Sequence, residues 1–116
     1  MKFTIQGRLD GLNDYIKANR SNRYAGAEMK RRNEELVMLS VRKVKIKQPV
    51  KIAFKWYEKN SRRDMDNIAF AKKFILDALV KKGVLKDDGW KWVKGFTDEF
   101  FIDKQNPRIE VEMEEV

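Results

Sequence analysis

The 116-residue chain contains no cysteine and no histidine. Their absence excludes disulfide bonds, thiol nucleophiles, imidazole bases and zinc sites built from cysteine and histidine. Any catalysis must therefore use carboxylates, lysine, tyrosine, hydroxyl groups or a hard metal ion that is held by oxygen ligands.

Long apolar runs are also absent. The apolar stretches are only a few residues long, and the opening MKFTIQGRLDGLNDYIK lacks the apolar core of a secretory signal. With 42% hydrophobic and 38% charged residues, the composition is typical of a folded and well-solvated globular protein. We expect one domain over residues 1–116, located in the cytoplasm and without a membrane partner.

Positive charge is concentrated in the first half of the chain. The formal net charge is +8, and residues 1–60 carry 15 Lys and Arg against 6 Asp and Glu. Residues 61–116 carry 11 basic against 12 acidic side chains, so the acidic residues belong to a different part of the sequence. The basic half favours a polyanionic partner, nucleic acid first and an anionic membrane surface second, with solubility alone as the alternative.

The apolar periodicity predicts an α+β domain. Alternating apolar residues predict strands, over residues 2–7, 44–60, 90–103 and 107–115. Helical spacing predicts a helical region over residues 12–42, which is broken at its polar middle. It also predicts a later helix over residues 67–82, which ends at a glycine. This order favours a mixed or antiparallel sheet of about four strands with helices packed on it, and a turn joins the last two strands.

The strand around Pro49 has one apolar and one basic face. Its apolar face includes Trp56, which we expect in the core, and its basic face carries Lys51, Lys55 and Lys59. These lysines either contact DNA phosphates or only solvate the open side of a sheet, and the sequence leaves both readings open. The predicted DNA-binding set is completed by two arginines of the following segment, Arg62 and Arg63.

Acidic residues flank the later helix. Asp64 and Asp66, followed by Asn67, stand where a helix N-cap and first turn belong, so helix capping is one explanation and a metal site the other. Beyond the helix, Asp87 and Asp88 form a polar turn or contribute further ligands. Mg²⁺ prefers oxygen ligands and usually takes one or two carboxylates together with substrate phosphate, so these four aspartates are the candidate metal ligands.

Lys73 follows Asp66 by seven residues, about two turns of a regular helix. It either reaches back to neutralise charge on a phosphate or forms an ion pair with Asp77, which we interpret as structural. Trp90 and Trp92, close to the acidic turn, could stack on bases, although packing is the favoured reading.

Residues 62–90 resemble the RusA-like Holliday junction resolvases, which are crossover junction endodeoxyribonucleases. The similar features are RRDMDN, KKFILDAL, the glycine after the helix and LKDDGW, with SNRYAG as a further similar element upstream. The resemblance implies a small homodimeric α+β protein that binds branched DNA in recombination and repair. It also implies a bacterial or phage-encoded, nucleoid-associated protein that nicks four-way junctions symmetrically with Mg²⁺, or with Mn²⁺ in its place.

The resemblance also implies roles for particular residues. Asp64, Asp66 and Asp88 become catalytic carboxylates that hold metal, and Asp87 is an additional ligand. Lys73, with Lys72 as the alternative, becomes the lysine that stabilises the transition state. The rival hypothesis is a non-catalytic basic module that binds nucleic acid. A small-molecule phosphoesterase is disfavoured, since a small substrate needs no strongly basic half.

Overall fold

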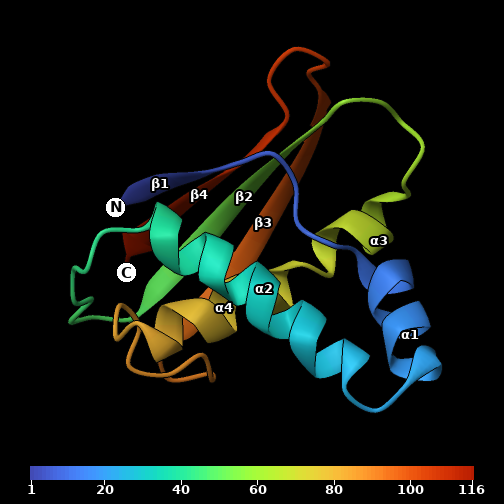
Figure 1. The fold of residues 1–116 in the computed structure, drawn as a ribbon. Coiled ribbons are helices and arrows are strands. Elements are labelled where there is room, and N and C mark those ends of the chain that lie inside the picture. The colour runs from blue at the N-terminus through green and yellow to red at the C-terminus, as the bar shows by residue number, and fades with distance from the viewer.

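The computed structural model describes all 116 residues, and its framework is a four-stranded mixed sheet with helices on one face (Figure 1). The strands lie in the spatial order β1-β4-β2-β3 and comprise β1 (Lys2–Gln6), β2 (Val50–Glu58), β3 (Val93–Ile102) and β4 (Arg108–Glu115). The helices are α1 (Leu12–Ser21), α2 (Ala25–Ser40), α3 (Met65–Ala69) and α4 (Lys72–Lys81). The predicted α+β class is confirmed. No helix in the chain has the length and apolar content needed to cross a membrane.

Strand β2 supplies the centre of the core, because both of its edges are paired and one of its faces lies under the helices. Burial alternates along the strand, so Phe54 and Trp56 are buried while Lys51 and Lys55 are exposed. The expectation that Trp56 packs in the core is confirmed. Its indole N–H donates to Asp98 Oδ1 at 2.8 Å, so the ring is buried without leaving its polar atom unpaired.

The last two strands are joined by a turn, as predicted, but they are not neighbours in the sheet. Strand β2 lies between them, antiparallel to β4 and parallel to β3. The connection crosses the end of β2, where the Asp103 N–H donates to the Glu58 carbonyl at 2.7 Å. Because parallel strands need a crossover connection, the chain reaches β3 from β2 through α3 and α4.

The predicted helical region at 12–42 is α1 and α2, with the break where the polar segment lies. The later helix differs from the prediction, because it is divided into α3 and α4. The Ala71 N–H bonds to the Ile68 carbonyl and the Lys73 N–H to the Phe70 carbonyl, both three residues back, which tightens the chain into a 3₁₀-like turn. Gly83, with φ of +81°, ends the helical segment as predicted.

Charged side chains join α2 to α4. Glu34 on α2 is buried, and it pairs with Lys30 at 2.5 Å and with Lys81 on α4. Lys30 also reaches Asp77 on α4 at 2.9 Å. Burial raises the pKa of the Asp77 carboxyl, but the hydrogen bond and charge of Lys30 and the charge of Lys73 outweigh this effect. The pKa of Asp77 is therefore held below its ordinary value.

We expect the substitution Asp77→Asn to lower the free energy of unfolding by about 1–2 kcal/mol at pH 6, since a charge-assisted hydrogen bond is lost. A carboxyl whose pKa is depressed by folding stabilises the protein above its unfolded pKa of about 3.9 and loses this effect as pH falls through the folded value. Urea denaturation should therefore show wild type and variant converging below about pH 4. Glu35→Gln, which removes an exposed partner of Arg31, is the control and should change stability by less than about 0.5 kcal/mol. An Asp77→Asn deficit that persists unchanged at pH 2 would contradict the assignment.

Candidate active site

Asp64 and Asp66 lie at the start of α3, directly after the chain leaves the end of β2. Asp64 has the extended N-cap backbone, with φ of −69° and ψ of 155°, yet its side chain makes no capping hydrogen bond. Both aspartates are exposed, and neither carboxylate has a hydrogen bond or an ion pair within the chain. Helix capping therefore does not account for them, and two carboxylates are free to bind a ligand.

The segment before these aspartates is anchored by a buried ion pair. Arg63 donates from Nε and Nη2 to the two carboxylate oxygens of Glu58, each at 2.9 Å, and from Nη1 to the Leu9 carbonyl at 3.1 Å. Glu58 is buried and the Arg63 side chain is only 12% exposed. The structure thus gives Arg63 internal partners in place of the free guanidinium that DNA binding would need. This side chain connects β2, the β1–α1 loop and the start of α3.

Asn67 anchors the other end of the aspartate segment. Its side chain is buried, and Oδ1 accepts a hydrogen bond from the Asn13 N–H at 2.9 Å near the start of α1. A β-carbon at Gly11 would lie 2.5 Å from the same oxygen, so glycine is needed for the close approach of α1. Sequence reasoning had placed Asn67 with the aspartates but missed its positioning role, which depends on a contact 54 residues away along the chain.

The two candidate lysines have different surroundings. Lys72 is held by Asp98 at 2.6 Å, with its ammonium 4.8 Å from the centre of the Phe96 ring. Lys73 is 59% exposed and pairs with Asp77 at 3.3 Å, which is the ion pair considered from the sequence. Because α3 and α4 are separate helices, the regular two-turn spacing between Asp66 and Lys73 does not apply. Lys73 is nevertheless the lysine that is more accessible to a substrate.

Asp87 and Asp88 lie beyond α4, in the loop that leads to β3. This loop is at the opposite end of α4 from α3, so one chain does not bring the four aspartates together (Figure 1). No three acidic side chains of the chain form a group that could hold a metal ion. The pair Asp64 and Asp66 is therefore one candidate half-site, and Asp87 with Asp88 is another.

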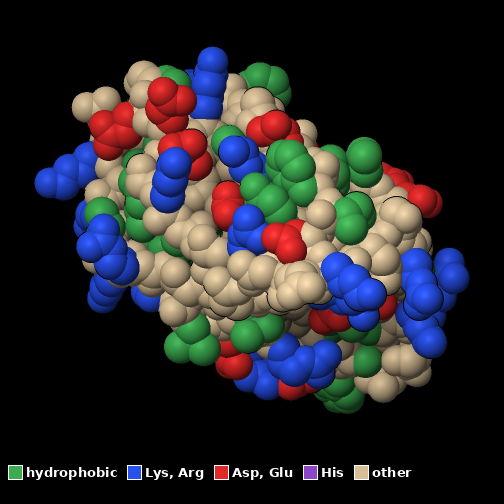
Figure 2. Space-filling view, turned by 90° about the horizontal axis from the view of Figure 1, so that it is seen from above, with side chains coloured by type: hydrophobic (Ala, Val, Ile, Leu, Met, Phe, Trp, Pro, Cys, Tyr) green, Lys and Arg blue, Asp and Glu red, His purple; other side chains and the backbone are tan.

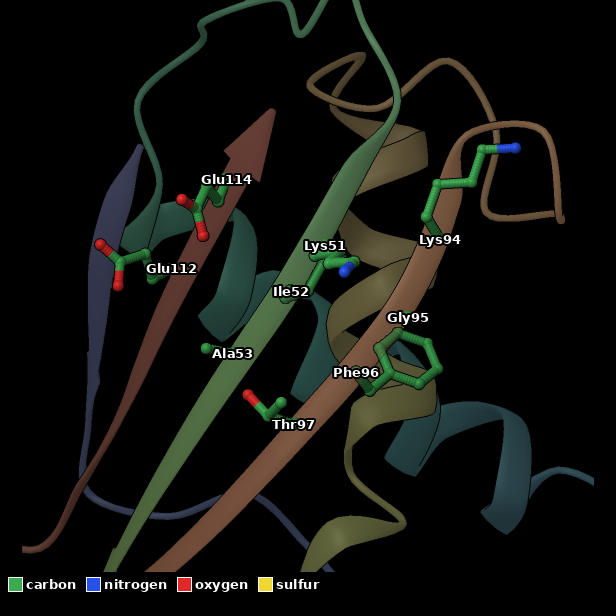
Figure 3. Close-up of a pocket in the computed structure, with 9 residues that line it drawn as sticks. All are labelled: Lys51, Ile52, Ala53, Lys94, Gly95, Phe96, Thr97, Glu112 and Glu114. Atoms are coloured by element: carbon green, nitrogen blue, oxygen red, sulfur yellow. The ribbon is translucent and has the colours of Figure 1, made fainter. Parts of the chain in front are cut away.

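The predicted DNA-binding lysines are divided between two surfaces. On the open face of the sheet, Lys51 lies opposite Glu114, and Lys55 lies between Glu110 and Glu99. Figure 3 shows Lys51 on β2 between the glutamates of β4 and the edge strand, in a shallow hollow of about 350 Å³. These neighbours favour the reading in which the two lysines solvate the sheet.

Lys59 and Arg62, in contrast, are exposed on the loop before α3, and neither forms an ion pair. They therefore lie beside the free aspartates with their charges available. Figure 2 shows that basic side chains form separate groups around the molecule, with acidic side chains between them. The positive charge is local, and no continuous basic face exists in this view.

The favoured reading of the tryptophans is wrong for Trp90. Its side chain is 94% exposed, whereas Trp92 is half-buried with the Lys86 ammonium 5.9 Å from its ring centre. The position of Trp90 next to the acidic turn is the one indication of this exposure in the sequence. The conformation of that turn exposes the side chain, and the period of apolar residues does not predict it.

The model of the endodeoxyribonuclease RusA family matches residues 13–114. The chain belongs to the RusA family. The resemblance seen over residues 62–90 is thereby confirmed and extends over nearly the whole chain. A search of curated proteins found no match.

RusA membership makes this chain an endodeoxyribonuclease of the kind that resolves Holliday junctions, with branched DNA as the implied partner. RusA nucleases generally depend on a divalent metal. The unpartnered carboxylates of Asp64 and Asp66 fit this chemistry, since a hard cation takes one or two carboxylates and completes its shell with water and phosphate.

The Glu58–Arg63 pair provides a test of how the aspartate segment is positioned. Glu58→Gln leaves the Arg63 charge buried without its counter-ion, and we expect it to lower the free energy of unfolding by about 3 kcal/mol. The measurement is urea denaturation at neutral pH. Glu112→Gln, which removes the exposed 3.5 Å pair with Lys2, should cost less than about 1 kcal/mol. Equal losses in the two variants would show that the buried pair is no stronger an anchor than a surface pair.

Proposed function

We propose that this protein is a Mg²⁺-dependent, structure-selective endonuclease that resolves four-way DNA junctions by paired symmetric nicks in recombination and repair. The observation that carries the proposal is the pair of free, anchored carboxylates at the start of α3 in a RusA-family chain. Mn²⁺ is expected to replace Mg²⁺, because it accepts the same oxygen ligands. The rival hypothesis is a basic nucleic-acid-binding module without catalysis. It predicts that metal neither changes the stability of the protein nor causes cleavage of DNA.

Asp64 and Asp66 would hold the metal through carboxylate oxygens that have no competing partner in the chain. When bound, the ion supplies a Lewis acid for the scissile phosphate and an activated water for in-line attack. The two aspartates are held in place on one side by the ion pair of Glu58 with Arg63 and on the other by Asn67. These contacts fix the backbone, so the two negative charges stay close together although they repel each other.

Lys73 is proposed to neutralise the charge that develops on the phosphate. Its contact with Asp77 is long and exposed, and Asp77 retains Lys30 if the Lys73 side chain turns towards DNA. Lys59 and Arg62 are proposed to bind the phosphates next to the aspartates. Lys51 and Lys55, which face glutamates, are assigned a smaller share of the binding.

Asp66→Asn tests the metal hypothesis, because asparagine keeps the size of this exposed side chain in the first turn of α3 but is a poorer ligand for a hard cation. We expect Mg²⁺-dependent nicking of a synthetic four-way junction to fall by about two orders of magnitude or more, the size of losing a transition-state-stabilising group. Unfolding should be unchanged, and junction binding should be retained or tightened, since a carboxylate no longer repels phosphate.

The matched control is Glu115→Gln, an exposed carboxylate without a partner at the far end of β4. It should nick at the wild-type rate. If Asp66→Asn also nicks at that rate, Asp66 is not a metal ligand. If wild type shows no metal-dependent nicking, the non-catalytic module is supported.

Asp88, with Asp87 beside it, is proposed as the remaining catalytic carboxylate. Because these residues lie at the far end of α4, we infer that a second subunit supplies them to the site of Asp64 and Asp66. A homodimer with twofold symmetry would then form two such composite sites, and two nicks at a twofold-symmetric junction require two sites related in the same way.

Mixed dimers test this arrangement. Asp66→Asn and Asp88→Asn homodimers should each be inactive, but a dimer containing one subunit of each has one site with both aspartates intact. Co-refolding equal amounts should therefore restore about a quarter of wild-type nicking, because about half of the dimers are mixed and each has one of two sites. Light scattering should give about twice the 13.8 kDa chain mass throughout. A dimeric but inactive mixture would show that each site lies within one chain.

A further inference from the structure

Trp90 is held in its exposed position by an ordered turn. The Gly89 carbonyl accepts hydrogen bonds from the Trp92 N–H at 3.0 Å and the Val93 N–H at 2.9 Å. The Trp92 carbonyl in turn accepts from the Val50 N–H at 2.9 Å, which ties the turn to β2. Trp90 therefore sits at the tip of a turn that is fixed to the sheet. A single exposed apolar side chain is common on protein surfaces, so the side chains around Trp90 decide whether it marks a contact site.

The turn borders a hollow with a second exposed aromatic ring. The hollow has a volume of about 310 Å³ and is lined by Asp88, Trp90, Val93, Lys94 and Phe96 together with two glycines. Phe96 is 45% exposed, and Figure 3 shows Lys94 and Phe96 projecting on the same side of β3. The volume lies at the lower end of the range of about 300–1,000 Å³ for ligand sites. Lys72 already covers part of the Phe96 ring, with its ammonium 4.8 Å from the ring centre, so Trp90 is the ring that is free to stack. An exposed aromatic ring in a hollow that a lysine also lines suits the flat face of a nucleobase.

A basic loop is fastened to the segment that leads to the hollow. We use this name for residues 42–47, in which the exposed basic side chains are Arg42, Lys43, Lys45 and Lys47. Ile46 is buried, and its N–H donates to the Val84 carbonyl at 2.8 Å, so the loop is fastened to the segment that leads to the acidic turn. At the start of the loop, the Lys82 ammonium donates to the carbonyls of Met38 and Val41.

The cations of this region have no counter-ions within the chain. None of the four basic-loop side chains forms an ion pair, and the same holds for Lys86, Lys91 and Lys94 around the hollow. An apolar protein partner would have to desolvate these charges without compensation. A polyanion with flat apolar faces satisfies both the charges and the aromatic rings, and nucleic acid has this combination.

We propose that the hollow of Trp90, Lys94 and Phe96 binds an unstacked base at the branch point of DNA, and that the basic loop binds the flanking phosphates. In a continuous duplex both faces of each base are covered by neighbouring bases, so only a branch, a nick or a single strand offers a face to Trp90. This inference rests on the proposed action on branched DNA and names the part of the branch that is recognised. It also places an unstacked nucleotide next to Asp88.

The test compares a four-way junction with a duplex of equal length, without divalent metal so that no strand is cut. Trp90→Ala should weaken junction binding about tenfold, the size expected for losing one base–aromatic stack, with duplex binding changed less than about twofold. Trp90→Tyr should recover most of the affinity, because tyrosine retains a stacking face. Leu36→Ala, which removes a half-exposed apolar side chain from α2, is the control and should bind both DNAs like wild type.

A second measurement observes Trp90 directly. Acrylamide should quench a large part of the tryptophan fluorescence of the free protein, and this part should disappear in Trp90→Tyr, because Trp56 is buried and Trp92 half-buried. Junction DNA should protect it and duplex DNA should not.

In the basic loop, replacing Lys45 and Lys47 by glutamine should reduce the slope of log affinity against log salt by about one for each phosphate that the variant no longer binds, on both DNAs.

Three results would overturn the inference. The first is wild-type junction binding by Trp90→Ala, and the second is protection from acrylamide by duplex and junction alike. The third is dissociation of the dimer in Trp90→Ala by light scattering, which would assign Trp90 to subunit contact. If the wild-type protein does not bind junctions more tightly than duplex and does not nick them, the proposed function itself fails. A wild-type enzyme that nicks junctions while Trp90→Ala binds them normally removes only this inference.

Discussion

The parallel pairing of β2 with β3 determines where the acidic residues of this protein lie. Neighbouring parallel strands run in the same direction, so the segment that follows β2 and the segment that precedes β3 lie at opposite ends of the strands. Asp64 and Asp66 follow β2, and Asp87 and Asp88 precede β3. Helix α4 lies between the two pairs. Separation of the aspartates is therefore a consequence of topology, and a change of side-chain conformation would not remove it.

The same pairing explains which parts of the fold could be predicted from the sequence. Period-two and helical patterns are local, and they indicated all four strands, both N-terminal helices and the burial of Trp56. Strand order is not local. The turn before Pro107 is compatible with a hairpin. The pairing of β2 with both β3 and β4, together with the hydrogen bond from Asp103 to Glu58, shows instead that the chain crosses the end of β2.

The candidate site was predictable in part for a similar reason. Asp64 and Asp66 stand out because two carboxylates and an amide at one helix start exceed what capping needs. The anchoring roles of Arg63 and Asn67 gave no such signal, since their partners are Glu58, Leu9 and Asn13, and no local pattern identifies a partner. The tight turn after Ile68 was also missed, because apolar residues continue at helical spacing across it and conceal the change in hydrogen bonding.

The anchoring of residues 42–47 affects how selectively this part of the molecule can bind. A lysine-rich segment that is free to move adapts to many arrangements of phosphates but loses conformational entropy each time it binds. This segment is fixed at its start by Lys82 and near its end by Ile46, so much of that entropy is already lost when the protein folds. Its affinity would then depend on whether the phosphates already match the positions of the cations. If the segment binds DNA as proposed, the angle at which the strands diverge would affect its affinity more than the order of the bases.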